Sequence, residues 1–198
     1  MHSFFSDGVL LPSEMLRRAV SLGYKGLAIT DHLDASNLEE VLAALLRFRA
    51  EGAGDFSLDF IPGVELTHVA PGRIAIMARR ARALGAGLVV VHGETLVEPV
   101  ASGTNLAAVH CPEVDVLAHP GLMTPAEAEL ARQNGVYLEI SSRRGHCLAN
   151  GHVARVAREV GAKLLVNPDA HGPGDMMDQS MAARVAAGGH DIPVEKIH

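Results

Sequence analysis

The sequence of 198 residues is poor in several residue types that mark particular protein classes. It has no Trp and only 4% aromatic residues, so its core must be built mainly from Ala, Leu and Val. Two cysteines, Cys111 and Cys147, are too few for a disulfide scaffold and favour a reducing compartment. No apolar run approaches the roughly 18 residues of a membrane span, and no signal peptide is visible. We therefore expect a soluble, cytoplasmic protein with no membrane partner.

The charge is not that of a protein that wraps nucleic acid. A formal net charge of −6 argues against binding duplex nucleic acid by neutralising its phosphates. Bound divalent cations would reverse the charge locally, so a small anionic molecule can still bind. With 48% apolar and 20% charged residues the chain can bury a sizeable core, and its length predicts one domain over residues 1–198.

Strand-like and helix-like segments alternate along the chain, which is typical of a parallel α/β fold. The expected strands are 26–30, 58–66, 87–92, 114–119, 136–141 and 163–167. The expected helices are 12–22, 36–52, 73–85, 99–109, 125–134, 151–160 and 176–187. Two helix starts, at Ser36 and Thr124, fit the capping-box pattern.

Metal-binding side chains close almost every apolar run and also open the chain. They are His2, Asp7, Asp31, His32, Glu65, His92, His119, Asp169 and His171. In α/β barrels the chemistry gathers at the C-terminal ends of buried parallel strands. Imidazole and carboxylate ligands suit zinc, manganese and iron, so the pattern predicts a multinuclear metal site at one mouth of a barrel. His68 follows Glu65 closely and could face the same pocket.

Six motifs carry a resemblance to a known family. In chain order they are His2-Ser3 with Ser6-Asp7-Gly8, Ile29-Thr30-Asp31-His32, Pro62-Gly63-Val64-Glu65, Val91-His92-Gly93-Glu94, Leu117-Ala118-His119-Pro120-Gly121 and Asp169-Ala170-His171. Together they resemble the successive motifs of the polymerase and histidinol phosphatase (PHP) family over roughly residues 2 to 171. The resemblance implies an α/β fold in which seven strands form a distorted, TIM-like (β/α)7 barrel. It also implies a site for two or three divalent metal ions that cleaves phosphate esters.

The resemblance further implies three adjoining metal positions with Glu65 shared between two of them. The three sets are His2, Glu65 and Asp169; Glu65, His92 and His119; and Asp7, His32 and His171.

One departure from the family is serious. The family pattern opens with a strand that carries His-x-His, and this chain begins just before what corresponds to the second His, His2. We therefore expect a truncated first strand, an unpaired sheet edge and a His2 position that is short of a ligand.

Catalytic roles follow from such a cluster. Metal ions lower the pKa of bound water, so that hydroxide is available at neutral pH to attack phosphorus. Arg143 or Arg144 would clamp the phosphate, and His146 could protonate the leaving group. Asp31 would orient His32 or a neighbouring ligand. Glu139 lies inside a strand and could either face the barrel mouth or form an ion pair with a basic residue.

Three functions are consistent with these residues. The leading interpretation is a phosphatase that releases phosphate from a small phosphorylated metabolite, for which histidinol phosphate is the example the family suggests. The second is a phosphodiesterase or exonuclease that acts on nucleotides or short oligonucleotides. The third is a non-catalytic module whose metals serve stability or assembly.

Overall fold

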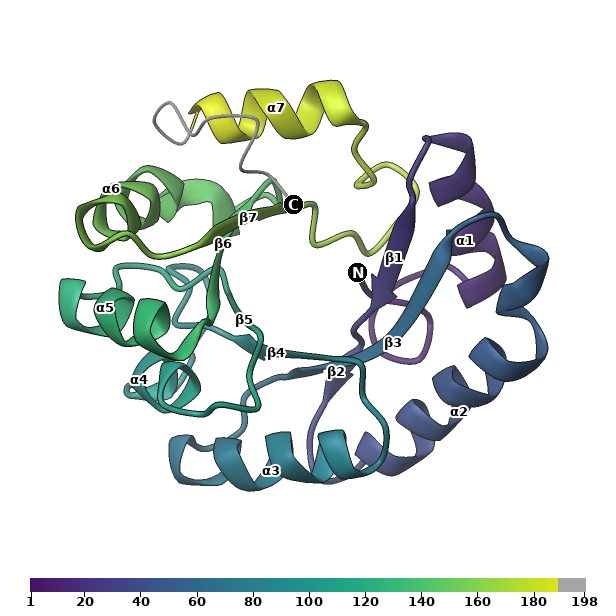
Figure 1. The fold of residues 1–198 in the computed structure, drawn as a ribbon, viewed down its shortest axis with the longest axis horizontal. Coiled ribbons are helices and arrows are strands. Elements are labelled where there is room, and N and C mark those ends of the chain that lie inside the picture. Colours follow the sequence, from purple (N-terminus) through teal and green to yellow (C-terminus); the bar gives the residue numbers. More distant parts are fainter. Residues whose placement is uncertain (189–198) are drawn as a thin grey trace.

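Parallel strands alternate with helices throughout residues 1–188, which are the residues that the computed structural model describes (Figure 1). The strands are β1 Gly26–Ile29, β2 His32–Leu33, β3 Asp59–Leu66, β4 Leu88–His92, β5 Val116–Ala118, β6 Tyr137–Ser141 and β7 Leu164–Asn167. The α-helices are α1 Pro12–Ser21, α2 Leu38–Glu51, α3 Pro71–Ala83, α4 Thr104–Val109, α5 Pro125–Asn134, α6 Asn150–Val160 and α7 Gln179–Gly188. Two 3-10 helices, η1 Ala53–Asp55 and η2 His146–Ala149, complete the order. The predicted single domain extends to residue 198, and its last ten residues lie outside the described part.

The sheet has the order β1-β3-β4-β5-β6-β7, with the short strand β2 paired to β3. Every pairing is parallel. The sheet curls into a half-barrel, and Figure 1 shows the helices arranged around its outside. This arrangement confirms the predicted α/β, TIM-like fold. Because all strands run in one direction, their carboxyl ends meet at one edge of the curled sheet.

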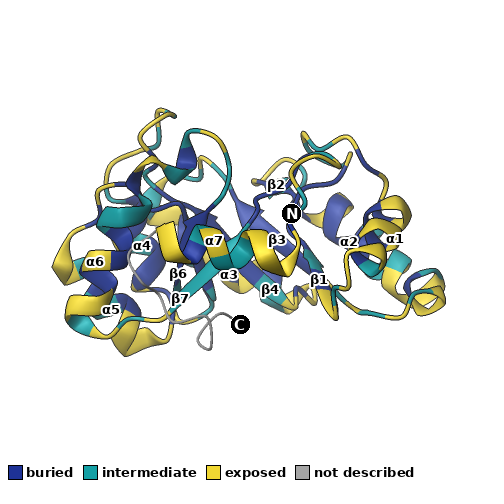
Figure 2. Cartoon of the chain, turned by 90° about the horizontal axis from the view of Figure 1, so that it is seen from above, coloured by how far each residue is buried: buried dark blue, intermediate teal, exposed yellow. Residues whose placement is uncertain are grey.

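Apolar side chains fill the layer between the sheet and its helices. Leu16, Ile29, Leu42, Leu117 and Leu138 are among the largest fully buried side chains of this layer. Figure 2 shows buried segments on the inside and exposed residues on the outer faces of the helices. A smaller apolar cluster on the inner side of the sheet is formed by Val90, Val116 and Ala118. Within residues 1–188 no helix is both long enough and apolar enough to cross a membrane.

One of the two predicted capping boxes is present in the structure. Thr124 forms the predicted capping box, because its hydroxyl accepts from the Glu127 N–H while the Glu127 carboxylate accepts from the Thr124 N–H. The predicted capping box at Ser36 is wrong: Ser36 donates to the Asp34 carboxylate instead, and α2 begins after Asn37.

Two helices begin later than predicted. Residues 94–103 form a loop before α4, and the Glu94 carboxylate accepts the N–H groups of Gly103 and Asn105 at 3.0 and 2.9 Å. That carboxylate stops the helix from extending back through the loop. Before α7, Asp178 accepts the Met181 N–H at 2.7 Å and so defines the first turn.

The start of the chain occupies the seam between the two edge strands β1 and β7. The Thr30 N–H donates to the Met1 carbonyl at 2.8 Å, and the His2 N–H donates to the Ala170 carbonyl at 2.9 Å. Figure 1 shows the N-terminus between these strands. Within the described residues β1 and β7 do not pair with each other, so the curled sheet stays open between these two strands. These two backbone hydrogen bonds hold His2 at the carboxyl end of the sheet.

Candidate metal centre

The predicted ligands come from separate elements and meet at the carboxyl end of the sheet. His32 begins β2, Glu65 lies near the end of β3, and His92 ends β4. His119 follows β5, and Asp169 follows β7. Parallel pairing places these positions side by side, since His32 lies in register with Glu65 and His92 with Ala118. The site is therefore a direct product of the sheet topology.

The first cluster joins His2, Glu65 and Asp169, all of which are buried. His2 Nε2 lies 3.3 Å from Glu65 Oε2 and 2.9 Å from Asp169 Oδ1. This set is the one that the resemblance implied for the first metal position.

The second cluster contains His2, Asp7, His32 and His171. Asp7 Oδ1 lies 3.1 Å from His171 Nε2 and 3.7 Å from His32 Nε2. The rings of His32 and His171 both stack on His2, with centroids 4.2 and 4.1 Å away. The structure thus brings together the predicted third set and adds His2 to it. Gly8 permits this approach, because a Cβ there would lie 2.1 Å from the His2 carbonyl oxygen.

The third cluster contains His92, His119 and His146, and all three rings are buried. Here the composition differs from the implied set of Glu65, His92 and His119. Glu65 stays at the border, with its Oε1 3.8 Å from His119 Nε2, while the His146 ring stacks on His119 at 4.1 Å.

Unpartnered buried atoms coincide with these clusters. Within residues 1–188, six buried side-chain nitrogen or oxygen atoms have no hydrogen-bond partner, and they belong to His2, Glu65, His92, His119, Asp169 and His171. A buried polar atom without a partner costs about 1–3 kcal/mol, so native proteins rarely tolerate several together. Cations bound among these donors would satisfy them. The residues present therefore fit a multinuclear metal site.

Backbone strain is also concentrated here. Among the described non-glycine residues only His68, His119 and Asp169 have positive φ, at 52°, 28° and 48°. Such conformations cost roughly 1–3 kcal/mol each and persist where surrounding contacts impose them. Glu139 supplies one such contact, because its carboxylate accepts the His119 N–H at 2.7 Å. Glu139 therefore faces the barrel mouth, where burial and the nearby Asp169 raise its pKa to about 8.

Charge is unevenly distributed over the clusters. Burial disfavours the protonated form of His2, but its ion-pair contacts with Asp169 and Glu65 prevail and raise its pKa to about 9. Burial lowers the pKa of His32 to about 4 and that of His119 to about 3, so both rings are neutral at pH 7. Neutral imidazole is the form that binds a metal ion. Burial would raise the pKa of Asp7, but its ion-pair contact with His171 prevails and lowers that pKa to about 2.

Asp31 has a structural role in this site. Its carboxylate accepts the Ser3 N–H at 2.7 Å, the Ser3 hydroxyl at 2.8 Å and the Ser6 hydroxyl at 2.7 Å. It thereby holds the segment that carries His2 and Asp7. Of the two roles predicted for Asp31, orienting His32 or a neighbouring ligand, these contacts fit the second, since the His32 Nδ1 contacts the Thr67 hydroxyl at 2.6 Å instead. This leaves His32 Nε2 free to face the cleft.

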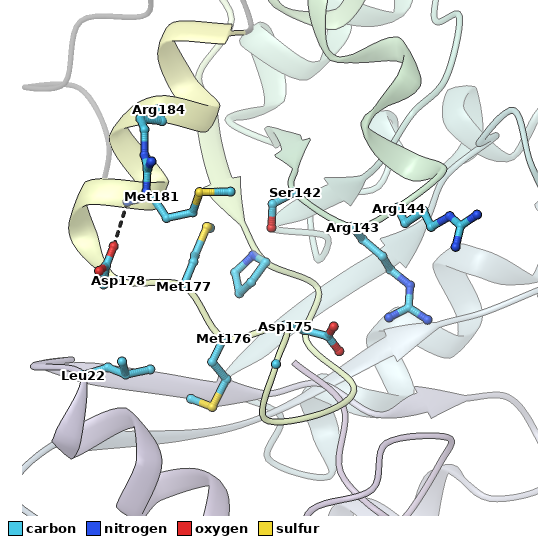
Figure 3. A pocket seen from close by; sticks show the side chains of 12 residues that line it. Leu22, Ser142, Arg143, Arg144, Asp175, Met176, Met177, Asp178, Met181 and Arg184 are labelled. Atoms are coloured by element: carbon cyan, nitrogen blue, oxygen red, sulfur yellow. Dashed lines mark hydrogen bonds between the residues drawn. The ribbon is translucent and has the colours of Figure 1, made fainter.

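A cleft of about 370 Å³ opens above the clusters, and Arg143 lies on its wall. Arg143 Nη1 donates to the Asp169 carbonyl at 3.2 Å, and its Nε lies 3.6 Å from Asp169 Oδ2. Arg144 is exposed and lines an adjoining pocket of about 600 Å³, which Arg143 also borders. Figure 3 shows methionines of the segment before and in α7 on one side of this pocket and Ser142–Arg144 on the other.

Sequence reasoning missed two groups at the cleft. Glu98 lies in the 94–103 loop with its carboxylate near three imidazoles, and no apolar run precedes it to mark it as a ligand. Thr95 contacts His146 Nδ1 at 2.7 Å. His68, which the sequence marked only by its closeness to Glu65, does line the cleft.

Comparison with known proteins agrees with this geometry. The family model described as "PHP domain" matches residues 1–115. The chain belongs to the PHP family. It has the PHP phosphoesterase fold, and its three clusters of His, Asp and Glu make a candidate multinuclear metal site.

Relatives of this PHP chain include one of similar length. Uncharacterized protein MJ1295 of Methanocaldococcus jannaschii is 46% identical over 94% of this chain and 86% of its own length. DNA polymerase/3'-5' exonuclease PolX of Bacillus subtilis is 27% identical over 94% of this chain, which spans 36% of that protein. Ribonuclease P protein component 3 of Natronomonas pharaonis is 28% identical over 70% of this chain and 52% of its own length.

A solved structure supports the architecture of the PHP chain. An adenosine deaminase from Xanthomonas campestris with bound zinc superposes with a TM-score of 0.56 at 13% identity. The match covers 91% of this chain and 45% of the deaminase. At that identity the likeness concerns the fold alone.

Proposed function

We propose that this protein is a metal-dependent phosphatase that hydrolyses phosphate monoesters of a small metabolite. The observation that carries the proposal is the set of unpartnered buried ligand atoms at the base of a cleft with an arginine on its wall. Those atoms suit zinc, manganese or iron ions. When bound, the ions would supply positive charge for the phosphoryl oxygens and an acidified water.

The residues of the chain would bind and orient the ester. We assign phosphate binding to Arg143, whose half-buried guanidinium already faces the cleft beside Asp169. A planar guanidinium can donate two parallel hydrogen bonds to a phosphate. Arg144 is exposed beyond the cleft, so we assign it to the organic part of the substrate.

The size of the cleft supports a small substrate. A volume of about 370 Å³ lies near the lower end of the usual range for small-molecule sites. The net charge of −6 also favours a compact anion that meets cations locally over duplex nucleic acid. Histidinol phosphate is one candidate of this size.

A release assay tests this proposal. Protein loaded with zinc, manganese or iron is expected to release inorganic phosphate from p-nitrophenyl phosphate or from members of a phosphomonoester panel, and chelation should abolish the release. Protein that binds these metals stoichiometrically yet leaves every phosphate ester intact would favour the non-catalytic alternative.

A phosphodiesterase is the second candidate. It is favoured by the adjoining pocket of about 600 Å³, which shares Arg143 with the cleft and offers room for a second esterified group. The similarity to a protein named as a 3'-5' exonuclease points the same way. Faster hydrolysis of bis-p-nitrophenyl phosphate than of p-nitrophenyl phosphate by one preparation would favour this candidate over the phosphatase.

A further inference from the structure

The third cluster has the geometry of a cation site, and unlike the other two it consists of imidazole side chains alone. We propose that His146 and Glu98 are metal ligands of this site, together with His92 and His119, and that Glu98 is the ligand that an incoming phosphate displaces. The proposed ligand set does not depend on which reaction the protein catalyses. The displacement of Glu98 by phosphate rests on the proposed function.

His146 is held so that one ring nitrogen faces the other two histidines. The Thr95 hydroxyl contacts Nδ1 at 2.7 Å, which leaves Nε2 turned toward the cluster. Each of the three rings offers a nitrogen within 4.8 Å of the nitrogens of the other two. A metal-binding histidine usually donates its other ring N–H to an acceptor, and the Thr95 hydroxyl is placed to accept from His146 Nδ1.

Glu98 approaches two of these three rings. Its Oε2 lies 3.1 Å from His92 Nε2, and its Oε1 lies 3.4 Å from His146 Nε2. Ligand atoms about 2.1 Å from one tetrahedral ion are roughly 3.4 Å apart, so each Glu98 oxygen lies at the separation expected between neighbouring ligands of one ion. Glu98 lies outside the group of mutually close ligand atoms formed by the three histidines, so one of its oxygens would move toward the ion on binding.

The loop that carries Glu98 is braced. The Glu94 carboxylate accepts the N–H groups of Gly103 and Asn105, and the Asn105 side chain donates to the Pro120 carbonyl at 2.8 Å. These bonds tie the loop to α4 and to the segment after β5. The position of Glu98 is therefore a property of the fold.

Ligand chemistry separates this site from the first cluster. Three imidazoles with one carboxylate suit zinc, whereas the two carboxylates of Glu65 and Asp169 in the first cluster suit harder ions such as manganese. The side chain of Glu98 is 36% exposed, while those of His92 and His146 are only 3% and 5% exposed. Glu98 alone of the four borders solvent, so it is the ligand that an incoming phosphate can replace.

Cobalt substitution tests the ligand set without relying on activity. Metal-free protein titrated with Co²⁺ is expected to develop visible absorption of tetrahedral cobalt. Both His146→Ala and Glu98→Ala should lose the share of that absorption that this site contributes, or weaken the affinity of this site by at least tenfold. Thr95→Val, which keeps all four ligands, should retain the absorption and weaken binding by about 10–100-fold. Matched controls are His110→Ala and Glu40→Gln, both exposed and remote from the cleft.

The outcomes separate this inference from the proposed function. Unchanged cobalt bands and stoichiometry in both His146→Ala and Glu98→Ala would overturn it. Glu98 lies on the surface of a braced loop, so its variant remains informative even where His146→Ala folds poorly. Full cobalt binding by an inactive His146→Ala protein would make His146 a proton donor instead. The variants could lose the cobalt bands while the wild type releases no phosphate. That outcome would support the metal site and contradict only the proposed phosphatase function.

The displacement is tested with inorganic phosphate on cobalt-loaded protein. Phosphate should shift the bands of the wild type and bind severalfold more tightly to Glu98→Ala, in which no carboxylate competes. Equal phosphate affinity in the two proteins would show that Glu98 does not occupy the phosphate position.

Discussion

The carboxyl end of the sheet differs from the layer between the sheet and its helices in the kind of atoms that it buries. The layer is apolar and closely filled, with residues such as Leu117 and Leu138 fully buried. The carboxyl end buries ionisable groups, leaves some of their atoms unpartnered and holds His119 and Asp169 at positive φ. The layer stabilises the fold, whereas the carboxyl end carries costly buried groups in the arrangement of a candidate metal site.

The largest effect on the carboxyl end is expected from a change at Glu65. This residue belongs to the first cluster and lies beside His119 of the third. Glu65→Ala is expected to lower metal content and to reduce kcat/KM for phosphate esters by on the order of 10³-fold or more, because the first metal position loses a ligand and the third loses a neighbouring carboxylate. Metal analysis and kinetics measure these effects, and activity within tenfold of wild type would refute a role of Glu65 in metal binding.

The converse test is Leu117→Ala in the apolar layer. The change leaves a cavity beneath β5 and should lower the free energy of unfolding by about 2–5 kcal/mol. Below the melting temperature the variant should bind as many metal ions as wild type. Denaturant unfolding and metal analysis give the two readings. A fall in metal content of the folded variant would mean that the two regions are not separable.

Two neighbouring arginines test how far the functional region extends. Arg143→Ala is expected to lower kcat/KM by about 100-fold, because the phosphate loses a positioned guanidinium. Arg144→Ala should change kcat/KM only a few-fold, since Arg144 is exposed and contacts the adjoining pocket. Steady-state kinetics on one phosphomonoester compares the pair. If the two substitutions lowered kcat/KM equally, the phosphate would bind closer to the adjoining pocket than we propose.

The smallest expected effect is a pH dependence of the metal-free protein. The pKa of His2 is raised from 6.5 to about 9 in the folded state, so its protonation stabilises the fold fully below pH 6.5. That contribution is lost as the pH rises through about 9. Melting temperatures of the metal-free wild type should therefore fall between pH 6.5 and 9.5, and less steeply in His2→Gln. Because a bound metal displaces the His2 proton, metal affinity should rise over the same interval. If the melting temperatures of wild type and His2→Gln fell equally with pH, the titrating group would be a residue other than His2.

The sequence by itself determined the order of strands and helices and the identity of most candidate ligands. Each strand is a short apolar run, and each ligand such as His92 or Asp169 follows its run directly, so both are local properties of the chain. Parallel pairing then requires the ligands to meet at one edge.

Only the tertiary structure decided how the ligands divide among the clusters. It placed His146 beside His119, brought Glu98 over His92 from a loop, and turned Asp31 toward Ser3 instead of His32. These contacts join residues that lie far apart in the chain, and they depend on the curl of the sheet and on loop conformations. No periodicity within a single segment encodes such distances, because they are set by the packing of all the elements together.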